Sequence, residues 1–325
     1  MVAVTPRSKA GRAVAAMAVV LVVLGGLFVG YGANAFGPDR LCRGWVSAAD
    51  AERALPGGGR LTASEESTST CTVERSGWWP WSEQRRLTIT VMSEKSRYPF
   101  ELSLWKVSGG SGVLVGPTAG SVDAWGGWAF LPQECTGEAP GTRSGERPTV
   151  RVSLSGAENL DGTAQLLATA ARGVAKKSAC GRANGSEPGA GALLRPSAVK
   201  DSDLGEVCGV PGFALPGLRG PDNTKVLEQT SGSFDSAWFC DLSFAHDEDN
   251  GPFTRIGVVK DPGLAAPLKD TGAERLMCAG EETFVVLDNV SYPWEPKERK
   301  AAGLPAEGEL SDLFVARVRA SPVCA

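Results

Sequence analysis

The sequence has 325 residues, of which 42% are apolar and 22% charged, and its formal net charge is −4. This length accommodates two domains of ordinary size, and the composition is that of a globular protein, which excludes a largely disordered chain. Residues 1–38 contain Arg7, Lys9 and Arg12 and no acid, so the rest of the chain has a net charge of −7. A mildly acidic body is a poor start for a nucleic-acid binder, which needs a basic face for phosphates, so we expect no nucleic-acid partner; the net charge leaves room for a local basic patch.

A segment without charged residues runs from residue 13 to residue 38. Its densest part, Ala13 to Gly32, is 20 residues long, and a helix of that length spans about 30 Å, the thickness of a bilayer core. The segment predicts a transmembrane helix at residues 13–34, with the lipid bilayer as its partner. Basic residues precede it, so the positive-inside rule predicts a single-pass protein of the cell membrane, with residues 1–12 in the cytoplasm and the C-terminal region outside.

A cleaved secretory signal is the alternative, because Ala33-Asn34-Ala35 fits the small-x-small cleavage pattern. The apolar run is longer than the ~7–15 residues of a typical signal core, which favours an uncleaved anchor. Both interpretations export residues 36–325.

All eight cysteines lie in this exported part: Cys42, Cys71, Cys135, Cys180, Cys208, Cys240, Cys278 and Cys324. An even number of cysteines in an oxidising compartment indicates disulfides. A metal site would need close ligand pairs such as C-x-x-C, and the sequence has none. We therefore expect disulfides, no metal and no other cofactor.

The cysteine spacing suggests a tandem repeat. The first two cysteines of each half are 29 and 32 positions apart and the last two 45 and 46, whereas the middle gaps are 64 and 38. The first half therefore has an insertion in its middle. In addition, Leu166 to Cys180 aligns without gaps with Leu310 to Cys324. The matching spans favour one pairing in both halves: Cys42–Cys71, Cys135–Cys180, Cys208–Cys240 and Cys278–Cys324.

These observations predict an α+β fold, in which the transmembrane helix is followed by two tandem homologous domains. The domains occupy residues 36–180 and 205–325, and a linker rich in Gly, Ala, Ser and Pro joins them at residues 181–204. Each domain is expected to be a small, mainly antiparallel sheet with a packed helix and disulfides. The helix should end each half, since apolar residues recur there every three or four positions.

Each half also begins in the same way. A Cys is followed by a Leu-Pro-Gly that ends a short helix in the first half, at Leu55 and again at Leu215, and then by a Cys entering a strand. This layout resembles the small Cys-bearing extracytoplasmic domains of actinobacterial lipoproteins and membrane-anchored envelope proteins. The resemblance covers residues 42–71 and 208–240 best, and the lipidation Cys of those lipoproteins is missing. It implies an extracytoplasmic location and this architecture, and no catalytic residue.

Catalytic motifs are weak. The only histidine, His246, lies in a polar run ending in Asn250-Gly251, which is typical of a hairpin turn. Ser197 and Lys200 match S-x-x-K, but no Ser-Asp-Asn or Lys-Thr-Gly accompanies them, so we interpret the match as chance. The glycine-rich residues 109–112 lack the spacing of a nucleotide-binding loop and predict a connection between strands.

The candidate binding residues are Trp78, Trp79 and Trp81, which surround Pro80. Pro80 disfavours a regular central strand, which places the tryptophans on a loop or an edge. They form either an exposed aromatic patch for a partner, glycan or membrane surface, or a cover over the core of the first domain.

The sequence thus favours a membrane-anchored binding or interaction protein of the bacterial envelope, whose partner is an envelope protein or a cell-wall ligand. No catalytic residue is assigned. The alternatives are an envelope enzyme that uses carboxylates alone, as glycosidases do, and a structural spacer.

Overall fold

The structure is a computed structural model that describes residues 17–23, 25–26, 37–76, 84–94, 107–155, 159–180, 191–220, 223–245, 251–288, 296–322 and 324. Two large antiparallel sheets dominate it, and a two-stranded sheet of β1 (Arg40–Leu41) and β2 (Val46–Ser47) precedes them. The predicted α+β class is therefore corrected to a mostly β architecture. Segments that the sequence left as loop or linker add strands to both sheets, and this changes the balance.

The first large sheet has the strand order β10-β6-β7-β8-β9-β5-β4-β3. Its strands are β3 (Leu61–Glu65), β4 (Thr70–Arg75), β5 (Arg85–Glu94), β6 (Gly112–Val115), β7 (Gly120–Asp123), β8 (Gly126–Phe130), β9 (Arg147–Ser155) and β10 (Ala192–Leu194). The helices α2 (Ala48–Ala54) and α3 (Leu160–Lys177) pack together, and α3 contacts β7, β8 and β9. The 3₁₀ helices η1 (Cys42–Gly44) and η2 (Gln133–Cys135) carry the first cysteine of each disulfide in this half.

Helix α3 forms where the apolar repeat predicts it. The Asn159 side chain caps its N-terminus by accepting a hydrogen bond from the Gly162 amide at 3.1 Å. Lys176 and Lys177 occupy the last turn, where positive charge complements the helix dipole. The apolar stripe between these ends is buried against the sheet.

The second large sheet has the order β11-β12-β13-β14-β16-β15. Its strands are β11 (Lys200–Asp201), β12 (Val226–Ser233), β13 (Ala237–Phe244), β14 (Thr254–Val259), β15 (Glu274–Cys278) and β16 (Glu281–Asp288). The remaining helices are η3 (Val207–Gly209), α4 (Pro262–Ala265), η5 (Ala266–Asp270), α5 (Pro296–Ala301) and α6 (Glu307–Ala320). Helix α6 ends this half as α3 ends the first, and its Phe314 and Val318 are buried in the core beside β13 and β14.

Both sheets share one strand arrangement. A three-stranded meander, β3-β4-β5 or β12-β13-β14, is followed by a strand pair whose second member, β9 or β16, joins the end of the meander. The first member, β8 or β15, lies on the far side of that strand. Strands β6 and β7 come between β5 and β8, in the middle of the first half. This order is what a tandem duplication with an insertion in the first copy predicts, and the homology of the two halves stays a prediction.

The predicted disulfide pairing is confirmed. The four bonds are Cys42–Cys71, Cys135–Cys180, Cys208–Cys240 and Cys278–Cys324. They use all eight cysteines, so none links one half to the other. The halves also share a backbone detail, since Cys42 and Cys208 both have a left-handed φ, at 53° and 58°.

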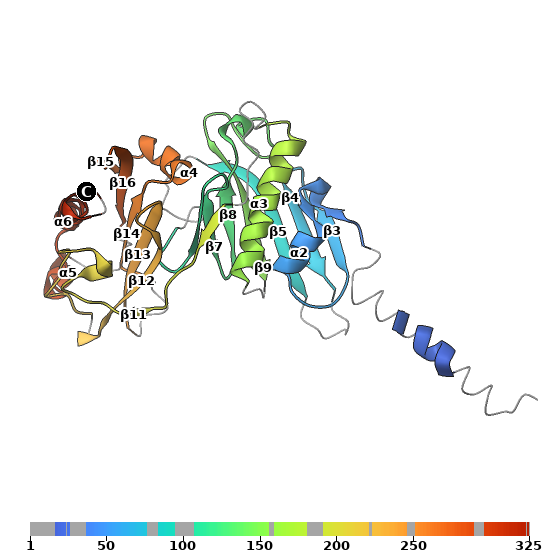
Figure 1. Cartoon of the computed structure of the whole chain (residues 1–325), viewed down its shortest axis with the longest axis horizontal. Helices are drawn as coiled ribbons and strands as arrows, with labels where there is room; N and C mark the ends of the chain where they lie inside the picture. Colours follow the sequence, from blue (N-terminus) through green and yellow to red (C-terminus); the bar gives the residue numbers. More distant parts are fainter. Residues whose placement is uncertain are drawn as a thin grey trace, which may run out of the picture.

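The two large sheets pack against each other. Figure 1 shows the second sheet with α6 on the left and the first sheet with α3 to its right. Trp128 and Phe130 of β8 meet Phe239 of β13 and Phe284 of β16 in a shared apolar cluster. All six residues of β14 are buried, because one face of this strand points to the α6 core and the other to the first sheet.

The glycine-rich segment lies at this interface. A side chain at Gly109 would come within 1.9 Å of the Gln229 backbone oxygen on β12, so only glycine fits there. The Gly109 amide donates a hydrogen bond to the Asp241 carboxylate of β13 at 2.9 Å. Residues 109–111 therefore do more than connect strands, because they bring the first half into direct contact with the second sheet.

Part of the predicted linker is regular structure. Strand β10 pairs with β6 of the first sheet, and β11 pairs with β12 of the second. Between them, Pro196 forms an isolated bridge with Ser231. Residues 192–201 thus run along both sheets, where they extend the interface.

The prediction of a transmembrane helix at residues 13–34 is wrong. Crossing a bilayer core requires about 20 apolar residues in one helix, and none of the helices in the described ranges is long and apolar enough to do so. Within the predicted segment, the described helical residues are 17–23 and 25–26. The same finding overturns the predicted single-pass location at the cell membrane with a cytoplasmic N-terminus.

Candidate functional site

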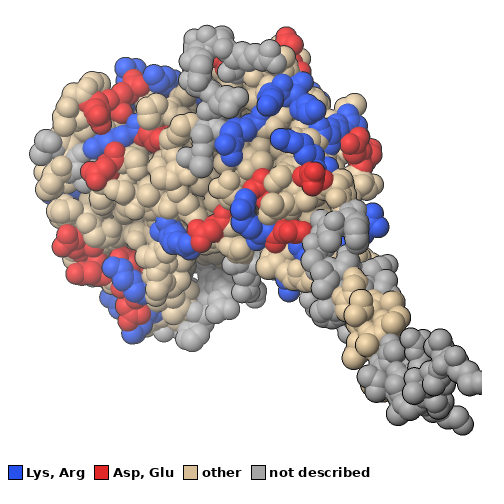
Figure 2. Space-filling model, turned by 45° about the vertical axis from the view of Figure 1, so that its right-hand side comes forward, with Lys and Arg blue, Asp and Glu red and all other residues tan. Residues whose placement is uncertain are grey.

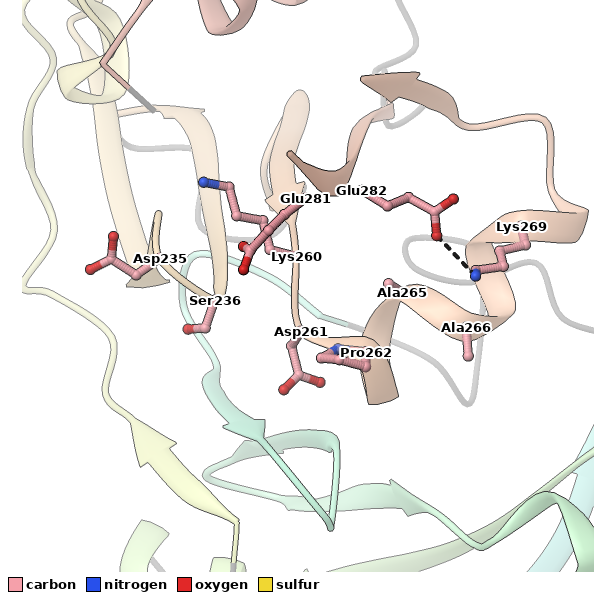
Figure 3. A pocket seen from close by; sticks show the side chains of 10 residues that line it. All are labelled: Asp235, Ser236, Lys260, Asp261, Pro262, Ala265, Ala266, Lys269, Glu281 and Glu282. Carbon is pink, nitrogen blue, oxygen red and sulfur yellow. Dashed lines mark ion pairs between the residues drawn. The ribbon is translucent and has the colours of Figure 1, made fainter. Parts of the chain in front are cut away.

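A pocket of about 460 Å³ opens at one end of the second sheet. It lies between the β12–β13 turn, the helices α4 and η5, and the β15–β16 turn (Figure 3). Its lining residues are Asp235, Ser236, Lys260, Asp261, Pro262, Ala265, Ala266, Lys269, Glu281 and Glu282. Charged side chains thus surround a small apolar surface of proline and alanine.

The local sequence explains how α4 forms this wall. Asp261 is its N-cap, and the carboxylate accepts a hydrogen bond from the Leu264 amide at 3.0 Å. Pro262 follows at the first helical position, where a missing N–H costs nothing. The amides of Lys260 and Asp261 both donate to the Ser236 carbonyl, which ties the wall to the β12–β13 turn.

Glu282 is fixed by two cations on the other side of the pocket. One carboxylate oxygen lies 2.9 Å from Lys269 Nζ, and the other lies 2.6 Å from a guanidinium nitrogen of Arg275. The Lys269 hydrogen bond and both positive charges lower the pKa of Glu282, and partial desolvation opposes them. Glu282 therefore stays ionised, whereas the general acid of a glycosidase needs a raised pKa.

The remaining charged side chains gather towards the opposite end. Figure 3 shows Asp235, Lys260 and Glu281 away from the dashed Glu282–Lys269 ion pair. The two carboxylates at this end offer hydrogen-bond acceptors for a positive group. This arrangement suits the binding of a small polar molecule.

On the face of the molecule that Figure 2 shows, side chains of opposite charge are intermixed. Figure 2 shows Lys and Arg interspersed with Asp and Glu over this face, apart from one group of basic side chains at the upper right. Within the described ranges, no three His, Cys, Asp or Glu side chains come together in a way that could hold a metal ion.

The structure separates the two members of the S-x-x-K match. The Ser197 hydroxyl accepts a hydrogen bond from the Thr230 amide at 3.0 Å, whereas Lys200 pairs with Glu228 at 3.0 Å. Each side chain thus has its own partner on β12.

The predicted binding residues Trp78, Trp79 and Trp81 lie outside the described residues, and so does His246. The pocket residues were not predicted from the sequence. Asp261-Pro262-Gly263 is an N-cap signal that locates the start of α4. The sequence does not predict the contact between Lys269 and Glu282, because the strand β15 lies between them in the chain.

Comparison with known proteins adds no relative, since no family model, no curated protein and no solved structure matches the chain.

Proposed function

We propose that the protein is a non-enzymatic binding protein that works outside the cytoplasm, and that the pocket beside α4 binds a small polar molecule carrying an amino group. The observation that carries this proposal is the charged lining of the pocket, in which carboxylates outnumber ammonium groups by four to two.

The disulfides support the compartment. Four disulfides in one chain are typical of an oxidising environment, because cytosolic thiols are kept reduced. They close loops within each half, which stabilises the fold mainly by constraining the unfolded chain.

The ligand class follows from how the carboxylates are used. Glu282 is committed to Lys269 and Arg275, and Asp261 accepts backbone amides. Asp235 and Glu281 lie at the opposite end, where the Asp235 carboxylate accepts a 3.5 Å hydrogen bond from the Ser233 hydroxyl, and we propose that these two carboxylates bind the ammonium group. Amino sugars with a free amino group, such as glucosamine, belong to this ligand class.

A thermal-shift experiment with matched ligands tests the proposal. Glucosamine should raise the melting temperature in a concentration-dependent way, and N-acetylglucosamine, which lacks the charge, should not. The Asp235→Asn/Glu281→Gln double variant should lose the shift, whereas Glu138→Gln, an exposed acid on the first half, should keep it. Equal shifts with both sugars, or an undiminished shift in the double variant, would exclude recognition of an ammonium group at this pocket.

The carboxylate enzyme is the weaker candidate. The lowered pKa of Glu282 is opposite to that of a general acid, and the cations that lower it occupy both carboxylate oxygens. A structural spacer would not need a pocket with fixed charges. The tryptophan loop stays a second predicted contact surface.

A further inference from the structure

Asp261 connects the pocket wall to the first half of the chain. One carboxylate oxygen caps α4 through the Leu264 amide, and the other accepts a hydrogen bond from the Gly116 amide at 2.7 Å. Gly116 follows β6, so this bond crosses between the two large sheets. Asp261 is buried, at 7% relative exposure, so breaking either bond would leave a poorly hydrated polar group.

The helix α4 also packs closely against the first half. A side chain at Gly263 would come within 2.7 Å of the Ala119 Cβ and within 3.3 Å of the Gly116 carbonyl oxygen. Leu264 and Leu268 are buried in the apolar cluster that the two sheets share. The turn between β6 and β7 therefore contacts one side of α4, and the other side faces the pocket through Pro262 and Ala265.

We infer that Asp261 is a positioning residue through which the first half sets the position of α4 and hence the shape of the pocket in the second half. The inference deepens the proposed function, since the pocket is its binding site. The β6–β7 segment of the first half, which has no counterpart in the second half, would thus have the role of positioning α4. It also predicts that a ligand that orders α4 slows exchange of the Gly116 amide, because coupling between two sites is reciprocal.

Two substitutions separate this positioning role from ordinary helix capping. Asp261→Ser keeps a good N-cap for Leu264, but its side chain is too short to reach Gly116. Asp261→Asn keeps the shape, but it offers one acceptor oxygen where the carboxylate offers two, so one of the two amides faces an NH₂ group. Asp270→Asn, at the exposed end of η5, is the control.

Amide hydrogen exchange of the full chain measures the effect without a ligand. In Asp261→Ser, we expect exchange at Gly116 and in residues 264–270 to become about tenfold faster or more, since one buried charge-assisted hydrogen bond is lost. Asp270→Asn should exchange as the wild type does. Wild-type exchange in residues 264–270 of Asp261→Ser would show that Asp261 is only a cap, and would overturn the inference.

A second variant keeps the test decisive if Asp261→Ser does not fold. Gly263→Ala leaves Asp261 unchanged but forces α4 away from Ala119, so it should accelerate the same amides, and unchanged exchange would contradict the inference. If the exchange results hold but glucosamine binds none of the proteins, the positioning role stands and the proposed ligand fails. If glucosamine binds the wild type and Asp261→Ser equally, the inference that the position of α4 affects binding at the pocket is overturned instead.

Discussion

The Glu228 carboxylate accepts a hydrogen bond from the Cys208 amide at 2.8 Å. Cys208 has a left-handed φ of 58°, and its sulfur is bonded to Cys240 on the neighbouring strand β13. Glu228 is 1% exposed and also receives a hydrogen bond from Ser202. The buried Glu228 carboxylate thus stabilises the left-handed backbone conformation of Cys208, which forms the disulfide with Cys240.

Replacing Glu228 with Gln should destabilise the protein by about 2 kcal/mol, because the amide cannot satisfy all of the buried donors around it. Urea unfolding measures the loss. The control is Asp201→Asn, which removes an ion pair with Lys225 in which both side chains are mostly exposed. That change should cost less than about 0.5 kcal/mol, since exposed pairs contribute little. Equal losses in the two variants would show that the buried hydrogen bonds of Glu228 contribute no more than an exposed ion pair.

A methyl group at Gly109 should separate the two sheets. Gly109→Ala places its Cβ against the β12 backbone, which cannot move without disturbing the ladder, and we expect a loss of about 1–3 kcal/mol. Gly308→Ala is the matched control, because nothing lies within 4 Å of a side chain there. Differential scanning calorimetry should show one transition for the wild type and the control. A single, unshifted transition in Gly109→Ala would mean that this contact is not needed for packing of the sheets.

Local patterns were sufficient for the disulfides and the terminal helices. Matching cysteine spans favoured the observed pairing, and the apolar steps before Cys180 mark the buried face of α3. Both signals depend on residues close together in the sequence or on repetition between the halves. They are independent of how one half packs against the other.

The packing of the sheets could not be predicted in this way. A strand buried on both faces, such as Thr254–Val259, shows no alternation that would reveal a second packed layer. Gly109 looks like part of an ordinary connection until the backbone of β12 is placed beside it. The pocket likewise depends on two turns and a helical connection that come together only after the second sheet has formed.

The ion pairs of Glu282 should make stability depend on pH in the acid range. The pKa of Glu282 is lowered in the folded protein, mainly by the Lys269 hydrogen bond, so the folded state favours the ionised form. The stabilisation is complete above the unfolded pKa of about 4.3 and is lost as the pH falls through the lower folded value. Glu282→Gln should therefore flatten the fall in stability below about pH 4.3. A Glu282→Gln variant that keeps the wild-type slope would contradict this prediction.

The last prediction concerns Trp78, Trp79 and Trp81, the candidate contact residues that lie outside the described part of the chain. If they form an exposed patch, replacing all three with Ser should leave the melting temperature within about 2 °C of the wild type, since exposed side chains contribute little to stability. Acrylamide should also quench more of the wild-type tryptophan fluorescence than of the fluorescence of the triple variant.

Trp125 supplies the control for that experiment, because its side chain is 75% exposed beside the β7–β8 turn. Trp125→Ser should lose quenchable fluorescence and keep its stability, which calibrates what one exposed tryptophan contributes. A triple variant that melts many degrees lower than Trp125→Ser would place the tryptophans in the core of the first half, since burying a tryptophan stabilises a fold by several kcal/mol. The contact surface would then have to be sought at the pocket beside α4 alone.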